Sequence, residues 1–154
     1  MSKTQGMLRE DALKGKNILI TGGGTGLGKA MTRYFLQLGA QCLITSRKED
    51  VIQKTATELS QETNGRCIAK ACDVRNYESV EEVIAYGIQE LGSIDVLVNN
   101  AAGNFISPTE RLSHRAFESV LGIVLQGTIN CTLALGKIWI ANKDHNKAVL
   151  NIVT

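Results

Sequence analysis

Short apolar runs alternate with longer amphipathic stretches along almost the whole chain. The apolar runs have the length of strands, and they occupy residues 17–21, 42–45, 67–72, 94–98 and 148–153. Between them, apolar side chains recur every three to four residues, which is the period of a helix with one buried side. This alternation predicts an α/β fold, in which right-handed crossovers build a parallel sheet flanked by helices.

The last helical stretch, residues 113–143, is the longest and the least regular. Glycine destabilises a helix interior, so Gly122 and Gly127 predict a break or a kink there. One side of the predicted helix is apolar and carries Phe117, Val120, Leu121, Val124 and Leu125. We therefore expect an amphipathic helix that is interrupted near its middle.

The order of the predicted elements places a ligand site at one edge of the sheet. A Rossmann-type, doubly wound parallel sheet of order 3-2-1-4-5 binds ligands beyond the carboxyl ends of its strands, where the winding reverses between the first and the fourth strand. We expect residues 14–154 to form this dinucleotide-binding domain, with the later strands of the fold missing. Residues 1–13 are expected to form an N-terminal extension.

A glycine-rich turn joins the first predicted strand to the first predicted helix. A dinucleotide pyrophosphate needs close backbone approach, N–H groups and a helix N-terminus, and this turn offers all three. The spacing is G-x-x-x-G-x-G rather than G-x-G-x-x-G, and a merely flexible turn is the alternative. The predicted cofactor contacts are Gly22, Gly23, Gly24, Thr25, Gly26, Leu27 and Gly28.

The turn after the second predicted strand reads Thr45-Ser46-Arg47-Lys48 and carries no carboxylate before Glu49. An NAD site usually has an acidic residue here that binds the ribose 2′-hydroxyl, whereas an arginine pairs with the 2′-phosphate of NADP. Arg47 therefore favours NADP(H) as the cofactor. A solvated basic turn is the alternative.

Polar residues follow the third and the fourth predicted strand at the same edge of the sheet. Asp73 and Val74 come after the third strand, and Asn99, Asn100 and Ala101 come at the end of the fourth. We assign Asp73, Val74, Asn100 and Ala101 to the cofactor site, where the polar side chains bind adenine or tie loops together. Asp73 also suits a turn or helix cap, and one of the two asparagines is expected to be structural.

Composition and charge indicate which classes of binding partner the chain has. With 154 residues, of which 44% are hydrophobic and 21% charged, the chain has the composition of a globular domain. A net charge of +2 and scattered basic residues argue against nucleic acid as a partner. The apolar runs are too short to span a bilayer, and residues 1–15 resemble neither a secretory signal nor a mitochondrial presequence. We therefore expect no membrane partner and a cytoplasmic protein, with the mitochondrial matrix as the alternative.

The four cysteines, Cys42, Cys67, Cys72 and Cys131, lie within apolar patterns. They show no C-x-x-C spacing, and no pair of histidines lies nearby. This arrangement predicts buried, reduced thiols and no metal site.

Three sequence features together resemble the short-chain dehydrogenase/reductase family. They are Thr21-Gly22-x-x-x-Gly26-x-Gly28, Asp73-Val74 and Asn99-Asn100-Ala101-Ala102-Gly103. Residues 99–112, which read NNAAGNFISPTERL, are similar to the 2,4-dienoyl-CoA reductase branch of that family. The resemblance covers residues 13–154, and the longer run is more specific than the glycine motif.

The resemblance implies that hydride from NADPH reduces a 2,4-dienoyl-CoA thioester to an enoyl-CoA, a step of fatty-acid β-oxidation. It also implies that residues 22–27 bind the cofactor diphosphate, Arg47 the 2′-phosphate and Asp73 the adenine. Asn104 would be the catalytic residue, as a hydrogen-bond donor to the thioester or to the developing dienolate. Positions at which relatives contact the acyl-CoA substrate are matched by Arg75, Phe105 and Ser113.

Each substrate contact has a structural alternative. Ser113 suits the N-cap of the helix that starts at His114, and we expect capping to be its main role. Phe105 could serve only to pack under its loop, and Arg75 only to form a surface ion pair.

Two departures from the family pattern limit the chemistry. Where the family carries an active-site asparagine on the long helix, this chain has Val124, which cannot relay a proton. The family's active-site tyrosine and cofactor-binding lysine would follow Thr154. We therefore expect the N-terminal portion of a longer, homo-oligomeric reductase, and no turnover by residues 1–154 alone.

Two other functions stay open. One is a different short-chain reductase, such as a 3-oxoacyl thioester reductase or an alcohol dehydrogenase. The other is a non-catalytic module that binds a nucleotide or dimerises.

Overall fold

The computed structural model describes residues 8–103 and 108–153, and its centre is a five-stranded parallel sheet. The strand order is β3-β2-β1-β4-β5, which confirms the predicted fold class and topology. The strands are β1 (Asn17–Thr21), β2 (Gln41–Thr45), β3 (Cys67–Ala69), β4 (Val96–Asn99) and β5 (Ala148–Asn151).

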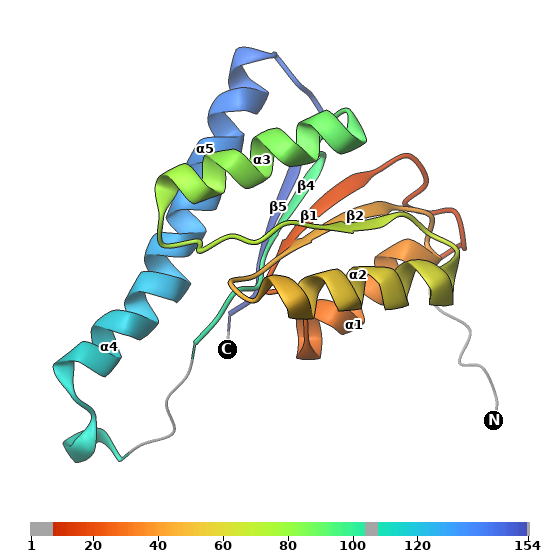
Figure 1. Ribbon diagram of the computed structural model, residues 1–154. Helices are drawn as coiled ribbons and strands as arrows, with labels where there is room; N and C mark the ends of the chain where they lie inside the picture. Colours follow the sequence, from red (N-terminus) through yellow and green to blue (C-terminus); the bar gives the residue numbers. More distant parts are fainter. Residues whose placement is uncertain (1–7, 104–107, 154) are drawn as a thin grey trace.

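Helices cover both faces of the sheet (Figure 1). On one face lie α1 (Gly26–Gln37) and α2 (Glu49–Thr63), and on the other α3 (Tyr77–Leu91) and α5 (Gly127–Ala141). A short 3₁₀ helix η1 (Thr109–Arg111) precedes α4 (His114–Leu121), which joins α5 through the π-helical turn η2 (Gly122–Gln126). Figure 1 shows α4 extending away from the sheet.

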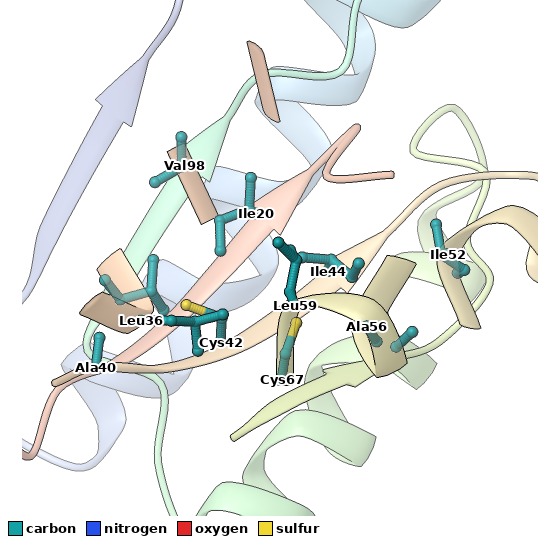
Figure 2. Packing of buried hydrophobic residues seen from close by; sticks show 12 residues of the cluster. Ile20, Leu36, Ala40, Cys42, Ile44, Ile52, Ala56, Leu59, Cys67 and Val98 are labelled. Atoms are coloured by element: carbon teal, nitrogen blue, oxygen red, sulfur yellow. The ribbon is translucent and has the colours of Figure 1, made fainter. Parts of the chain in front are cut away.

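The alternation of side chains along β1 builds two cores, one on each face. Ile18 and Ile20 belong to the core under α1 and α2, where Figure 2 shows Ile20 among side chains of both helices and of β2. Leu19 points to the opposite core, which α3 and α5 cover. All five residues of β1 are buried, as expected of a central strand in a parallel sheet.

Several expected boundaries change: β2 begins at Gln41 rather than at residue 42, and β5 ends at Asn151 rather than at residue 153. β3 ends at Ala69 rather than at residue 72, and β4 covers residues 96–99 rather than 94–98. The predicted break at Gly122 and Gly127 is instead a π-helical turn, through which the backbone stays helical from α4 to α5. Gly127 lies tightly against the loop after β3, since a Cβ atom there would stand 2.5 Å from Cγ2 of Val74.

The prediction of buried, reduced cysteines is confirmed. All four thiols are free and buried, and Figure 2 shows Cys42 and Cys67 within the core of α1 and α2. Burial raises the pKa of each thiol, and that of Cys67 and Cys131 to about 12. These groups are therefore neutral and unreactive packing side chains.

The helical segment from α4 to α5 is apolar on a side that the described residues leave open. No residue of α4 is buried. The exposed apolar side chains of this segment, called here the apolar stripe, are Phe117, Leu121, Val124, Leu125, Ile129, Leu133 and Ile140.

The whole span His114–Ala141 is long and apolar enough to cross a membrane, contrary to the expectation of apolar runs that are too short. One such helix is weak evidence for a span, because core helices of globular proteins meet the same test.

Candidate nucleotide-binding site

The glycine loop takes a backbone path that side chains would obstruct. Gly22 and Gly26 have positive φ angles of 66° and 52°, a region that glycine adopts without steric cost. A Cβ atom at Gly22 would lie 3.0 Å from the Cα of Ala101, and one at Gly28 would collide with the carbonyl oxygen of Gly22. The loop therefore brings its backbone close to the end of β4.

Helix α1 starts directly from this loop. Thr25 is the N-cap residue, and its side chain makes no capping hydrogen bond. The first N–H groups of a helix have no partner within the helix, and they lie at the positive end of its dipole. An anionic group above Gly26, Leu27 and Gly28 is therefore favoured at this position.

Hydrogen bonds from α2 and from the residues that follow β4 hold the loop in place. On the side of α2, the buried Thr55 hydroxyl donates to the carbonyl oxygen of Gly24 at 2.9 Å. On the side of β4, the Asn100 amide nitrogen Nδ2 donates to the carbonyl oxygens of Thr21 and Gly22 at 3.0 and 3.2 Å. The hydroxyl of Thr21 accepts from the backbone N–H of Ala101 at 2.9 Å. The loop is thus preorganised before any ligand binds.

The two asparagines at the end of β4 both have structural hydrogen bonds. Asn99 donates to Oγ1 of Thr132 in α5 at 3.1 Å and to Oδ1 of Asn151 in β5 at 2.9 Å. Asn100 also borders the cavity described next. The expected structural role of one asparagine is thus met, and the second asparagine also ties neighbouring elements together.

A cavity of about 500 Å³ lies at the carboxyl ends of the strands. It is large enough for a nucleotide-sized ligand. Its lining contains most of the predicted cofactor residues, namely Gly22, Gly24, Thr25, Gly26, Leu27, Gly28, Arg47, Asp73, Val74, Asn100 and Ala101. It also contains residues that sequence reasoning did not select, namely Thr45, Ser46, Lys48, Val51, Cys72, Ala102 and Ile123.

The charged side chains of the cavity come from the turns after β2 and β3. Arg47 is exposed in the turn after β2. Asp73 is held by Arg75, whose Nε atom lies 2.9 Å from Oδ1 and 3.1 Å from Oδ2 of the carboxylate. This hydrogen-bonded pair lowers the pKa of Asp73, and the positive charge of Arg47 acts in the same direction. Asp73 is therefore an anionic acceptor at neutral pH.

The remaining predicted site residues lie elsewhere. Gly23 does not line the cavity but packs against β2, where a Cβ atom would stand 2.7 Å from the side chain of Ile44. Ser113 caps α4 by accepting a hydrogen bond from the N–H of Ala116 at 3.1 Å. Arg75 forms an ion pair with Asp73, which is the structural role expected as the alternative to substrate binding. Asn104 and Phe105 lie outside the described residues.

None of the three tyrosines lines the cavity. Tyr34 lies in α1, and Tyr77 and Tyr86 lie in α3. Among the described residues, the lining therefore contains no phenol that could donate a proton to a substrate.

This fold and site define the class of protein. Residues 16–153 match the family described as short chain dehydrogenase, and the chain belongs to that family, whose members use NAD(H) or NADP(H). A probable 2,4-dienoyl-CoA reductase 3 of Caenorhabditis elegans is 44% identical over 138 residues, which are 89% of this chain and 45% of the relative. A probable 2,4-dienoyl-CoA reductase of Bacillus subtilis is 36% identical over 137 residues, or 89% of this chain and 53% of the relative.

A solved structure is similar over the same region. The crystal structure of a short chain dehydrogenase from Bacillus anthracis matches with a TM-score of 0.86 and 39% identity, over 93% of this chain and 58% of that one. The chain spans about half the length of the curated relatives that it matches. The resemblance to the oxidoreductase family, and to its relatives named as 2,4-dienoyl-CoA reductases, is thereby confirmed.

Proposed function

We propose that this chain supplies the NADP(H)-binding part of a 2,4-dienoyl-CoA reductase. The observation that carries the proposal is the cavity at the carboxyl ends of the strands, which combines the N-terminus of α1 with the exposed Arg47. The names of the relatives from Caenorhabditis elegans and Bacillus subtilis support the substrate class.

The residues of the cavity fit such a cofactor. Gly22 and Gly28 let the loop pack closely on the end of β4, and the space beside Gly26, where a Cβ atom would meet no atom within 4 Å, allows a diphosphate to approach the backbone. The N–H groups at the start of α1 donate to it. Arg47 pairs with the 2′-phosphate, and Asp73 accepts from the exocyclic amine of adenine. The bound cofactor supplies hydride, and the protein contributes position and electrostatics.

Arg47 is the residue on which the choice between NADP and NAD depends. We expect Arg47→Ala to weaken NADP⁺ binding about 10- to 100-fold, because one charge-assisted contact to the 2′-phosphate contributes about 1.5–3 kcal/mol. The affinity for NAD⁺, which has no such phosphate, should stay within about twofold. Titration calorimetry of the 154-residue chain with both dinucleotides measures the two effects.

Lys54→Ala is the matched control, because it removes a cation from an exposed position of α2 that does not line the cavity. It should leave both affinities unchanged. A wild-type chain that prefers NAD⁺, or an equal loss for both dinucleotides in Arg47→Ala, would contradict the assignment of NADP.

The second half of the proposal concerns the substrate. We propose that Asn104 donates a hydrogen bond to the thioester oxygen of a 2,4-dienoyl-CoA and that Phe105, Ser113 and Arg75 contribute to the acyl-CoA site. Because no tyrosine lines the cavity among the described residues, we expect no NADPH oxidation when this 154-residue chain is mixed with a dienoyl-CoA. Absorbance at the NADPH band tests this directly, and measurable turnover refutes it.

The apolar stripe also supports a homo-oligomer for the protein to which this chain belongs, since exposed apolar surface of this extent usually marks a protein interface. The absence of a tyrosine from the described lining favours one alternative, a nucleotide-binding module without catalysis. A reading frame that continues past Thr154 into a segment with tyrosine and lysine would support the reductase, and one that stops there would support the module.

A further inference from the structure

A buried asparagine of α5 is fully engaged with the loop that follows β3. Asn130 is only 5% exposed. Its Nδ2 atom donates to the carbonyl oxygen of Val74 at 2.9 Å and to that of Arg75 at 3.2 Å. Its Oδ1 atom accepts from Nε2 of Gln126 at 2.8 Å. The two donor hydrogens and the acceptor of this amide therefore all have partners.

The loop that Asn130 holds forms one wall of the nucleotide cavity. Asp73 and Val74 line this wall. Arg75 connects the two contacts, because its backbone carbonyl is bound by Asn130 while its side chain holds the carboxylate of Asp73. The close packing of Gly127 against Val74 leaves the loop no space to shift toward α5.

We propose that Asn130 is a positioning residue of the nucleotide site, which fixes Asp73 and Val74 at the distance from the glycine loop that an adenosine group requires. This inference rests on the proposed binding of NADP(H) in the cavity. Asn130 does not line the cavity itself, so it acts only through the loop.

An amide suits this position because it offers two hydrogens to donate and one oxygen to accept. A carboxylate at residue 130 would oppose two carbonyl oxygens without a hydrogen to donate, and an aliphatic side chain would remove a donor from the buried oxygen of Val74 and from the partly buried oxygen of Arg75. The loop would then move away from α5 to reach water. That movement displaces Asp73 and Val74 but leaves the glycine loop, which Thr55 and Asn100 hold separately, in place.

The test compares Asn130→Asp with Asn142→Asp, which makes the same chemical change at an exposed residue beyond the end of α5. The ¹⁵N-labelled 154-residue chain is titrated with NADP⁺, and amide shifts are followed at residues 22–28 and 73–76. We expect Asn130→Asp to weaken NADP⁺ binding at least about tenfold, with NADP⁺-induced shifts kept at residues 22–28 and lost at residues 73–76. Asn142→Asp should behave as the wild type.

Two results overturn the inference while the proposed function stands. One is a folded Asn130→Asp variant that binds NADP⁺ as the wild type does, and the other is an equal loss of shifts at both segments, which a merely structural role produces. A wild-type chain that does not bind NADP⁺ contradicts the proposed function itself. If Asn130→Asp does not fold, the test uses Gln126→Ala, which removes the exposed side chain that donates to Asn130. This variant should weaken NADP⁺ binding about two- to threefold and lose the NADP⁺-induced amide shifts at residues 73–76. Unchanged binding overturns the inference.

Discussion

The two faces of the sheet differ in how far the described chain covers them. Under α1 and α2, large side chains such as Leu36, Ile52 and Leu59 are buried. On the opposite face, α3 and one side of α5 are also well packed, but α4 buries no residue. At the edge of the sheet, all four residues of β5 are exposed, on both faces. The covered region of the molecule contains the glycine loop, and the open region carries the apolar stripe.

This difference separates the nucleotide cavity from the exposed apolar surface. The cavity takes its walls from loops after β1, β2, β3 and β4, which lie between packed elements, and only Ile123 comes from the π-helical turn. The apolar stripe and β5 offer instead an apolar surface and an unpaired strand edge, which are features of association surfaces. We therefore expect mutations in the two regions to affect different properties.

Two leucines of the same helix give the largest expected contrast. Leu135 is fully buried against the sheet, whereas Leu133 is 53% exposed in the apolar stripe. Leu135→Ala should lower the free energy of unfolding by about 2–5 kcal/mol, because it leaves a cavity in the core. Leu133→Ala should lower it by less than about 0.5 kcal/mol, as is usual for surface positions. Urea denaturation followed by circular dichroism measures both.

Protein concentration serves as the control for this pair. A large loss of stability in Leu133→Ala that grows with concentration would show that a second copy covers the stripe in solution. Equal losses that do not depend on concentration would contradict the contrast between the two sides of α5.

Features that depend on neighbouring residues in the sequence could be predicted, whereas features that depend on long-range packing could not. The glycine loop was predictable because three local signals coincide there: an apolar strand, glycines and the start of an amphipathic helix. The place of Arg47 in the cavity lining was predictable because it lies in the turn just after the end of β2. The contact of Asn130 with Val74 was not, since it joins residues 56 positions apart and depends on how α5 docks.

Other features of the fold could not be predicted from the sequence, for physical reasons. The π-helical turn between α4 and α5 is defined by backbone hydrogen bonds between residues five positions apart, which amino-acid composition does not indicate. This turn contains Ile123, a lining residue of the cavity that the sequence did not predict. The periodicity around Phe117 and Leu121 correctly indicates an apolar side, but periodicity alone does not say whether this chain covers it.

A pair of glycines gives the second contrast. A Cβ atom at Gly28 would collide with the carbonyl oxygen of Gly22, whereas one at Gly136 in α5 would meet no atom within 4 Å. Gly28→Ala should therefore lower the free energy of unfolding by about 1–3 kcal/mol and abolish measurable NADP⁺ binding. Gly136→Ala should raise it by up to about 1 kcal/mol, because alanine favours a helix interior.

Thermal and urea denaturation, together with NADP⁺ titration, test this pair. If both alanine variants lose stability equally, the cost lies in helix packing in general and not in the glycine loop. If Gly28→Ala still binds NADP⁺, the close approach of loop and helix is not needed for the cofactor.

The smallest expected effect concerns the ion pair between Lys147 and Asp95, next to the start of β5. Nζ of Lys147, just before β5, lies 2.8 Å from Oδ1 of Asp95, and the two side chains are only 13% and 14% exposed. Burial opposes the ionisation of Asp95, but the hydrogen bonds from Lys147 and from the N–H of Asn17 outweigh it and lower the pKa of this carboxyl. Lys147→Met should therefore cost about 1–2 kcal/mol at pH 7, because it leaves a carboxylate without its main partner.

The pH dependence of this loss distinguishes an ion pair from simple packing. A carboxyl with a lowered pKa stabilises the fold above its unfolded value of about 3.9, and this contribution disappears as the pH falls through the folded pKa. The difference between wild type and Lys147→Met should thus be constant near neutral pH and shrink below about pH 4, where protonation removes the charge of Asp95. Lys143→Met, at an exposed lysine nearby, should show no such difference. A loss that is as large at pH 3 as at pH 7 would contradict a contribution from the charge pair between Lys147 and Asp95.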